Sequence, residues 1–194
     1  MASVAKASGH ATPAIVKSPS RGVQYDTNML NSPAFALGIQ DAAFLRIEHL
    51  SILAASRGPD NIPSVARALG CRLSSDLRQV TLFFCLSEAQ KLFAHVAANH
   101  VIAAVFAVPS THQALQLKGS DGRVERLLES DFHLVTTYRK AFVGHLERLG
   151  YSCALIDALL ACESNDLGAV TFTPSSAFSQ TPGPKAGHPI GGTE

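Results

Sequence analysis

Residues 80–108 read VTLFFCLSEAQKLFAHVAANHVIAAVFAV, and three patterns follow one another in this stretch. VTLFFCL (80–86) is rich in Phe, Val and Thr, which is typical of a β-strand. In SEAQKLFAHVAANH (87–100) the apolar residues recur at the spacing of one helix face. VIAAVFAV (101–108) is apolar on both faces, which indicates a central strand. The stretch therefore predicts a strand, a helix and a strand in succession.

Short apolar runs separated by turn sequences surround this stretch. RGPDNIP and SSDLRQ carry the Gly, Pro, Asn, Asp and Ser residues that mark turns. Because the strands are joined by short turns with few crossovers, we expect antiparallel pairing in a small barrel decorated by helices, a mainly β protein of α+β class. The further expected elements are a helix at 33–48, strands at 50–57, 64–73, 112–119 and 167–174, and helices at 131–150, with Leu134 and Leu149 facing inward, and at 152–162.

Two terminal segments have the composition of tails. Residues 1–31 are rich in Ala, Ser and Pro and show no clear period, and residues 181–194 are rich in Pro and Gly. We therefore expect one folded domain at 32–180, between a flexible N-terminal tail and a Pro/Gly-rich C-terminal tail.

The composition excludes several classes of protein. The 194 residues are 46% apolar and 16% charged, which is typical of a globular chain. A net charge of +1, with no Lys/Arg block, argues against nucleic-acid binding. Polar residues interrupt the uncharged stretch 96–117, so no membrane span is expected. Four cysteines without a C-x-x-C pair, and no secretory leader, favour thiols in the reducing cytoplasm.

The start of the helix at 87–100 is the first candidate anion site. The N–H groups at a helix N-terminus attract phosphate, and Ser87, Gln90 and Lys91 could add hydrogen bonds and charge. Ser87 and Gln90 also have the spacing of a capping box, in which they would cap their own helix. The residues alone leave both interpretations open.

Charged and polar side chains on two predicted strands are the second candidates. Arg67 and Arg72 are five residues apart, so a regular strand points them to opposite faces, and the one in apolar surroundings needs an anion or a route to water. His112, Gln116 and Lys118 lie opposite leucines in 112–119 and form a polar face, either for solvent or for an anionic ligand.

Other chemistries have no support in the pattern. The histidines lack metal-ligand spacing, so we expect no metal site. No glycine-rich phosphate loop and no nucleophile elbow occurs, which argues against the common nucleotide sites and hydrolase triads.

Three segments together resemble the pyridoxamine 5′-phosphate oxidase-like family of flavin-binding split barrels. They are IPSVARALGCRL (62–73), the stretch 80–110 ending in VPS, and THQALQLKG (111–119). The resemblance extends over about residues 40–185. It implies a six-stranded antiparallel split β-barrel of FMN-binding type that works as a homodimer, with FMN in clefts at the subunit interface.

The resemblance also implies roles for individual residues. Basic residues of the second strand and polar residues at the junction after the third would hold the phosphate, the second strand would line the flavin ring, and the fifth strand would reach the cofactor. In this sequence the corresponding residues are Arg67, Arg72, Ser87, Gln90, Lys91, Val65, Leu69, Gln116 and Lys118. No catalytic residue can be named.

The chain departs from the family pattern after the junction serine. Glu88 and Ala89 stand where the oxidases carry an Arg-Lys pair, and the chain has no tryptophan. We therefore expect an FMN-binding oxidoreductase of unknown small-molecule substrate, and not the oxidation of pyridoxamine phosphate itself. A non-enzymatic flavin- or haem-binding module and a deazaflavin-dependent reductase are the alternatives.

Overall fold

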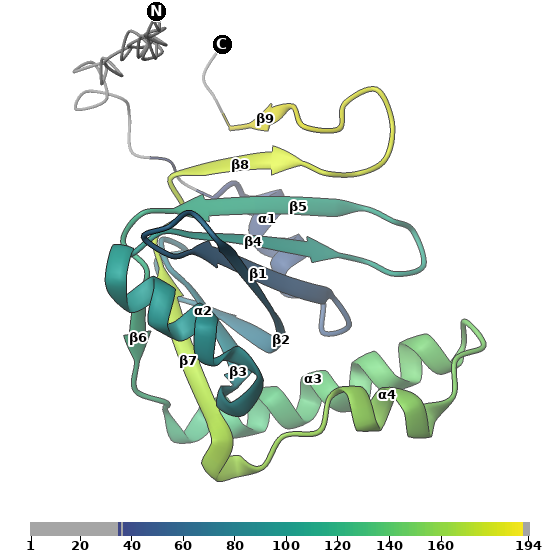
Figure 1. The fold of residues 1–194 in the computed structure, drawn as a ribbon. Coiled ribbons are helices and arrows are strands. Elements are labelled where there is room, and N and C mark those ends of the chain that lie inside the picture. The colour runs from purple at the N-terminus through teal and green to yellow at the C-terminus, as the bar shows by residue number, and fades with distance from the viewer. Residues whose placement is uncertain (1–34, 36, 192–194) are drawn as a thin grey trace, which may run out of the picture. The chain divides into compact units, whose positions relative to one another are not determined.

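The computed structural model describes Phe35 and residues 37–191, so the predicted tail at 1–31 lies outside the described residues. The described chain forms one antiparallel sheet in the order β6-β7-β3-β2-β1-β4-β5-β8-β9, accompanied by four α-helices (Figure 1). The strands are β1 (Ser51–Arg57), β2 (Pro63–Leu73), β3 (Val80–Cys85), β4 (Ile102–Ala107), β5 (Ala114–Gly119), β6 (Arg123–Glu125), β7 (Leu167–Phe172), β8 (Ser176–Ser179) and β9 (Pro189–Ile190). The helices are α1 (Ile39–Leu45), α2 (Leu86–Asn99), α3 (Glu129–Glu147) and α4 (Cys153–Leu159), with a 3-10 turn, η2, at Ser164–Asp166.

The predicted α+β split-barrel class is confirmed, because the sheet is antiparallel and remains open. It has nine strands among the described residues where six were expected. The additional pairing includes β8 and β9, which extend the sheet beyond β5 through residues 176–190 (Figure 1). The Pro/Gly-rich segment after residue 180 thus returns to the sheet edge.

The long strand β2 is the corner at which the sheet changes direction. It pairs with β1 through its first half and with β3 through its second half, and the register shifts between Ala68 and Cys71. Gly70 in this bulge has φ of +124°, and a Cβ there would lie 3.3 Å from Cβ of Tyr138 on α3. Both the backbone conformation and the close approach of α3 therefore require glycine.

The core lies between the two halves of the sheet and under the helices. Its largest fully buried side chains include Phe83, Phe84, Phe106 and Phe172. Helix α2 contributes Ala89, Leu92 and Val96 at helical spacing and so closes the core over β1 and β2.

Helices α3 and α4 lie side by side at one end of the sheet (Figure 1). Helix α3 buries Val135, Tyr138, Phe142 and Leu146, whereas Leu134 is exposed, as is Leu149 beyond its end. The predicted inward face was therefore rotated by about one residue. Among the described residues, no helix combines the length and apolar character that crossing a membrane requires.

Candidate functional site

One side of the sheet is exposed, and we call it the outer face. It consists of the outward side chains of β2, β1, β4, β5 and β8. On β1, Ile52 and Ala54 point to the core while Leu53 between them is 41% exposed. Val65 on β2 is 63% exposed. Because side chains alternate along a strand, the register decides which residues share this face.

The register places the outward residues in two neighbouring rows across five strands. In one row Arg67 pairs with Leu53, which pairs with Val105, followed by Gln116 and Phe178. The next row runs through Val65, Ala55, Ala103, Lys118 and Ser176. Four of the predicted site residues, from strands far apart in the sequence, therefore lie on one face.

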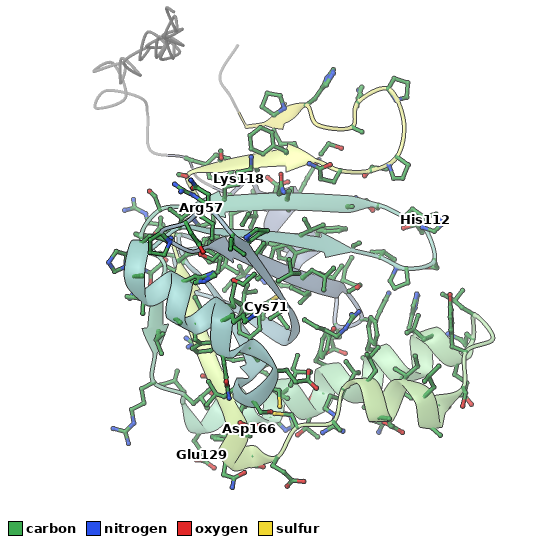
Figure 2. The ribbon with its side chains drawn as sticks, viewed as in Figure 1. Arg57, Cys71, His112, Lys118, Glu129 and Asp166 are labelled. Atoms are coloured by element: carbon green, nitrogen blue, oxygen red, sulfur yellow. The ribbon has the colours of Figure 1, made fainter. Side chains whose placement is uncertain are left out.

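The polar groups of the outer face make few internal contacts. Arg67 Nη1 donates a long hydrogen bond of 3.4 Å to Ser51 Oγ. The Lys118 ammonium lies 4.6 Å from the centre of the Phe178 ring (Figure 2). Gln116 accepts a hydrogen bond of 3.2 Å from the amide of Gln180. In the part of the chain that the structure describes, neither Arg67 nor Lys118 pairs with a carboxylate.

His112 does not belong to this face. Strand β5 begins at Ala114, and His112 lies exposed in the preceding turn with φ of +59°. Figure 2 shows His112 and Lys118 at opposite ends of β5. The polar face predicted for 112–119 is therefore formed by Gln116 and Lys118, and the inclusion of His112 was wrong.

Arg72 lies in different surroundings from Arg67 because the bulge at Gly70 intervenes. Its Nε is 2.9 Å from Oδ1 of Asp131, a fully buried carboxylate on α3. The other oxygen of Asp131 accepts the backbone N–H of Leu128 and so caps α3. The anion that Arg72 was expected to need is thus supplied by the chain itself.

A cavity of about 310 Å³ lies beside this ion pair, between α3 and the bulged half of β2. Arg46, Arg72 and Thr137 contribute polar groups to its wall, and Tyr138 and Cys71 contribute apolar surface. Burial raises the pKa of the Cys71 thiol to about 12, so this thiol is protonated at neutral pH.

The start of α2 differs from the predicted capping box. The helix begins at Leu86, and its N-cap, Cys85, makes no side-chain capping bond. Asp166 from η2 supplies the cap instead, since its carboxylate accepts the Ser87 backbone N–H at 3.1 Å and the Ser87 hydroxyl at 2.6 Å. These bonds, with one from the Cys85 thiol, lower the pKa of Asp166. A carboxylate therefore already lies at this helix N-terminus.

The remaining predicted site residues are separated from the outer face within one chain. Gln90 and Lys91 are exposed on α2, which packs on the core side of the sheet. Leu69 is buried in the core at 3% exposure, next to the bulge. The structure thus brings together Val65, Arg67, Gln116 and Lys118, and it distributes the others among three further places.

One cluster was missed by sequence reasoning. The thiols of Cys85 and Cys162 and the carboxylate of Asp166 place donor atoms within 4.8 Å of one another. The cysteines are far apart in the sequence and form no C-x-x-C motif, so no local signal could have revealed their proximity.

No family model matches the chain, and no curated protein matches it. Solved structures that resemble its fold include a protein related to general stress protein 26, of the pyridoxine phosphate oxidase family, from Clostridium acetobutylicum. That match has 14% identity over 73% of this chain and 85% of the other, with a TM-score of 0.43. HupZ of Group A Streptococcus matches at 12% identity over 78% and 100% of the two chains, with a TM-score of 0.46. A pyridoxamine 5′-phosphate oxidase-related, FMN-binding protein from Nostoc punctiforme matches at 12% identity over 74% and 83%, with a TM-score of 0.41. At these identities and scores the likenesses carry no argument about function.

Proposed function

We propose that the chain binds FMN on the outer face and acts as a flavin-dependent oxidoreductase on a small-molecule substrate. One observation carries this proposal: Arg67 and Lys118 lie on the same exposed face with no carboxylate partner in the described residues. Two uncompensated cations near an amide suit a dianionic phosphate, which guanidinium binds through parallel hydrogen bonds.

The same face offers apolar surface for a flat ring system. Leu53, Val65 and Val105 lie between and beside the polar groups, in the two rows already described. A bound flavin would supply hydride chemistry, and the chain would orient the ring and exclude water from it. We assign no general acid or base to the chain, and we expect a substrate other than pyridoxamine phosphate.

We further propose that a second copy of the chain covers the outer face and that the protein works in the cytoplasm. Leu53 and Val65 are large apolar residues exposed on a sheet otherwise rich in alanine at these positions. Exposed apolar surface of this kind is typical of an interaction site, and a two-fold pair would enclose the cofactor between its subunits.

The roles of Arg72, Ser87, Gln90, Lys91 and Leu69 in cofactor binding stay predictions. A phosphate at the start of α2 would compete with Asp166 for the Ser87 N–H and hydroxyl. Because two anions repel at this distance, we assign the phosphate to Arg67 and Lys118 instead.

The test begins with the absorbance spectrum of the purified protein and with FMN titration followed by flavin fluorescence. We expect about one FMN per chain, and Arg67→Ala should weaken binding about 10- to 100-fold, the loss of one charge-assisted hydrogen-bond group. Arg126→Ala is the matched control, since Arg126 is also exposed but lies beyond β6.

Light scattering of the same samples should give a dimer for both variants. The proposal fails if the wild-type chain takes up no FMN or if Arg67→Ala binds it unchanged. A Soret band in the purified protein would favour a haem-binding module, and uptake of a deazaflavin alone would favour the corresponding reductase.

A further inference from the structure

The cluster of Cys85, Cys162 and Asp166 joins three segments of the chain. Cys85 ends β3, Cys162 follows α4, and Asp166 ends η2 immediately before β7. The Cys85 thiol lies 3.0 Å from Oδ2 of Asp166, and all three donor atoms lie within 4.8 Å of one another. Figure 2 shows Asp166 at the beginning of β7, near the start of α2.

These separations suit donors that surround a single ion. In tetrahedral zinc sites the metal lies about 2.3 Å from sulfur and about 2.0–2.2 Å from carboxylate oxygen, so neighbouring donors are about 3–4 Å apart. The cluster therefore needs only small side-chain adjustments to reach this geometry. Two sulfur donors select a thiophilic metal such as Zn²⁺ over Mg²⁺ or Ca²⁺.

Ser87 holds the carboxylate of the cluster in place. Its backbone N–H and its hydroxyl both donate to Asp166, and the hydroxyl oxygen lies 3.4 Å from the Cys85 sulfur. Groups that hydrogen-bond a ligand in this way orient it toward the metal and are a regular part of metal sites. The hydroxyl oxygen is also near enough to be a fourth donor.

The surroundings provide both access and charge compensation. A cavity of about 80 Å³ lined by Cys162, Glu163 and Arg139 opens next to the cluster. Two thiolates and a carboxylate around Zn²⁺ leave one net negative charge. The positive end of the 14-residue helix α2 lies at this point, and Arg139 lies along the cavity wall.

We propose that Cys85, Cys162 and Asp166 bind Zn²⁺, with the Ser87 hydroxyl or a water molecule in the fourth position. On binding, each thiol releases its proton to solvent and forms a sulfur–zinc bond, and no redox step is involved. The ion links the end of β3, the loop after α4 and the start of β7. This site does not depend on the proposed flavin function.

The test is a titration of the full-length, reduced protein with Zn²⁺ and, separately, with Co²⁺ as a spectroscopic probe. We expect about one ion per chain and about two protons released. Cobalt should show a thiolate-to-metal charge-transfer band and intense tetrahedral d–d bands. Cys162→Ser should abolish the charge-transfer intensity of one thiolate and weaken binding at least tenfold, and Asp166→Asn should weaken it by about tenfold.

The chain provides matched controls in its other cysteines. Cys71→Ser and Cys153→Ser should bind both ions as the wild type does, because neither thiol belongs to the cluster. Circular dichroism of every variant verifies folding, and Cys162, which is only half-buried, avoids the risk attached to the buried Cys85.

Three results would overturn the proposal. The wild type could take up no Zn²⁺, or Cys162→Ser could bind it unchanged, which would indicate surface histidines. A disulfide between Cys85 and Cys162, mapped in the purified protein whose reduced form binds no metal, would assign the cluster to thiol chemistry instead.

Discussion

The outer face and the start of α2 both offer groups suited to an anion, yet they differ in one respect. At α2 the chain supplies its own anion, since Asp166 occupies the N–H and hydroxyl of Ser87. On the outer face Arg67 and Lys118 have no such partner among the described residues. Arg72 belongs with the first case, because Asp131 neutralises it. A cation or a helix N-terminus therefore indicates an external ligand only where the fold brings no carboxylate to it.

The largest effect is expected from removing the internal anion of Arg72. Asp131→Ala leaves the guanidinium beside an apolar wall and removes the cap of α3, so we expect the free energy of unfolding to fall by about 3 kcal/mol. Urea unfolding at neutral pH measures the loss.

The exposed pair of Arg123 and Glu125 is the control for this prediction. Its charged atoms are 3.9 Å apart and both side chains are well exposed, so Glu125→Ala should cost about 0.5 kcal/mol or less. Equal losses in the two variants would show that Asp131 does not compensate Arg72.

The second largest effect concerns the bulge that separates Arg67 from Arg72. Gly70→Ala meets both a positive φ and the Tyr138 side chain at 3.3 Å, so we expect a loss of about 2 kcal/mol. Gly150→Ala, at φ of +90° with open space around it, should lose only about 1 kcal/mol. Thermal unfolding followed by circular dichroism compares the two, and an equal loss would mean that contact with α3 adds no strain.

The secondary structure was largely predictable because it depends on local patterns. The strands β1, β2 and β3 and the helix α2 lie within one residue of the expected bounds. Runs of β-branched and aromatic residues and the helical spacing of apolar residues are visible in short windows. Helix α1 is shorter than the expected helix at 33–48, whose first residues lie outside the described chain.

The site was predictable only where the register follows from alternation. Val65, Arg67, Gln116 and Lys118 lie on one face because strands alternate and pair in an antiparallel order. The partners Asp131 and Asp166 come from distant segments, and no local pattern relates them to Arg72 or Ser87. The bulge changes the direction of β2, which also could not be derived from a regular strand.

A pH experiment tests whether Asp166 contributes as an internal anion. Its hydrogen bonds from Ser87 and Cys85 lower the pKa of the folded carboxyl below the ordinary 3.8. The stabilisation is therefore present above the unfolded pKa and is lost as the pH falls through the folded value. In metal-free protein, Asp166→Asn should unfold at lower urea concentration than wild type at neutral pH, and the two midpoints should converge toward about pH 3. Midpoints that stay equally far apart across this range would contradict the assignment.

The smallest effect on stability is expected on the outer face. The Lys118 ammonium contacts only the exposed side of the Phe178 ring, so Lys118→Ala should change the free energy of unfolding by about 0.5 kcal/mol or less. The same variant should nevertheless weaken FMN binding severalfold in the fluorescence titration. The contrast with Asp131→Ala is informative, because a charge that contributes little to folding can be kept for a ligand. A stability loss comparable to that of Asp131→Ala would instead assign Lys118 a structural role and weaken the case for a cofactor on this face.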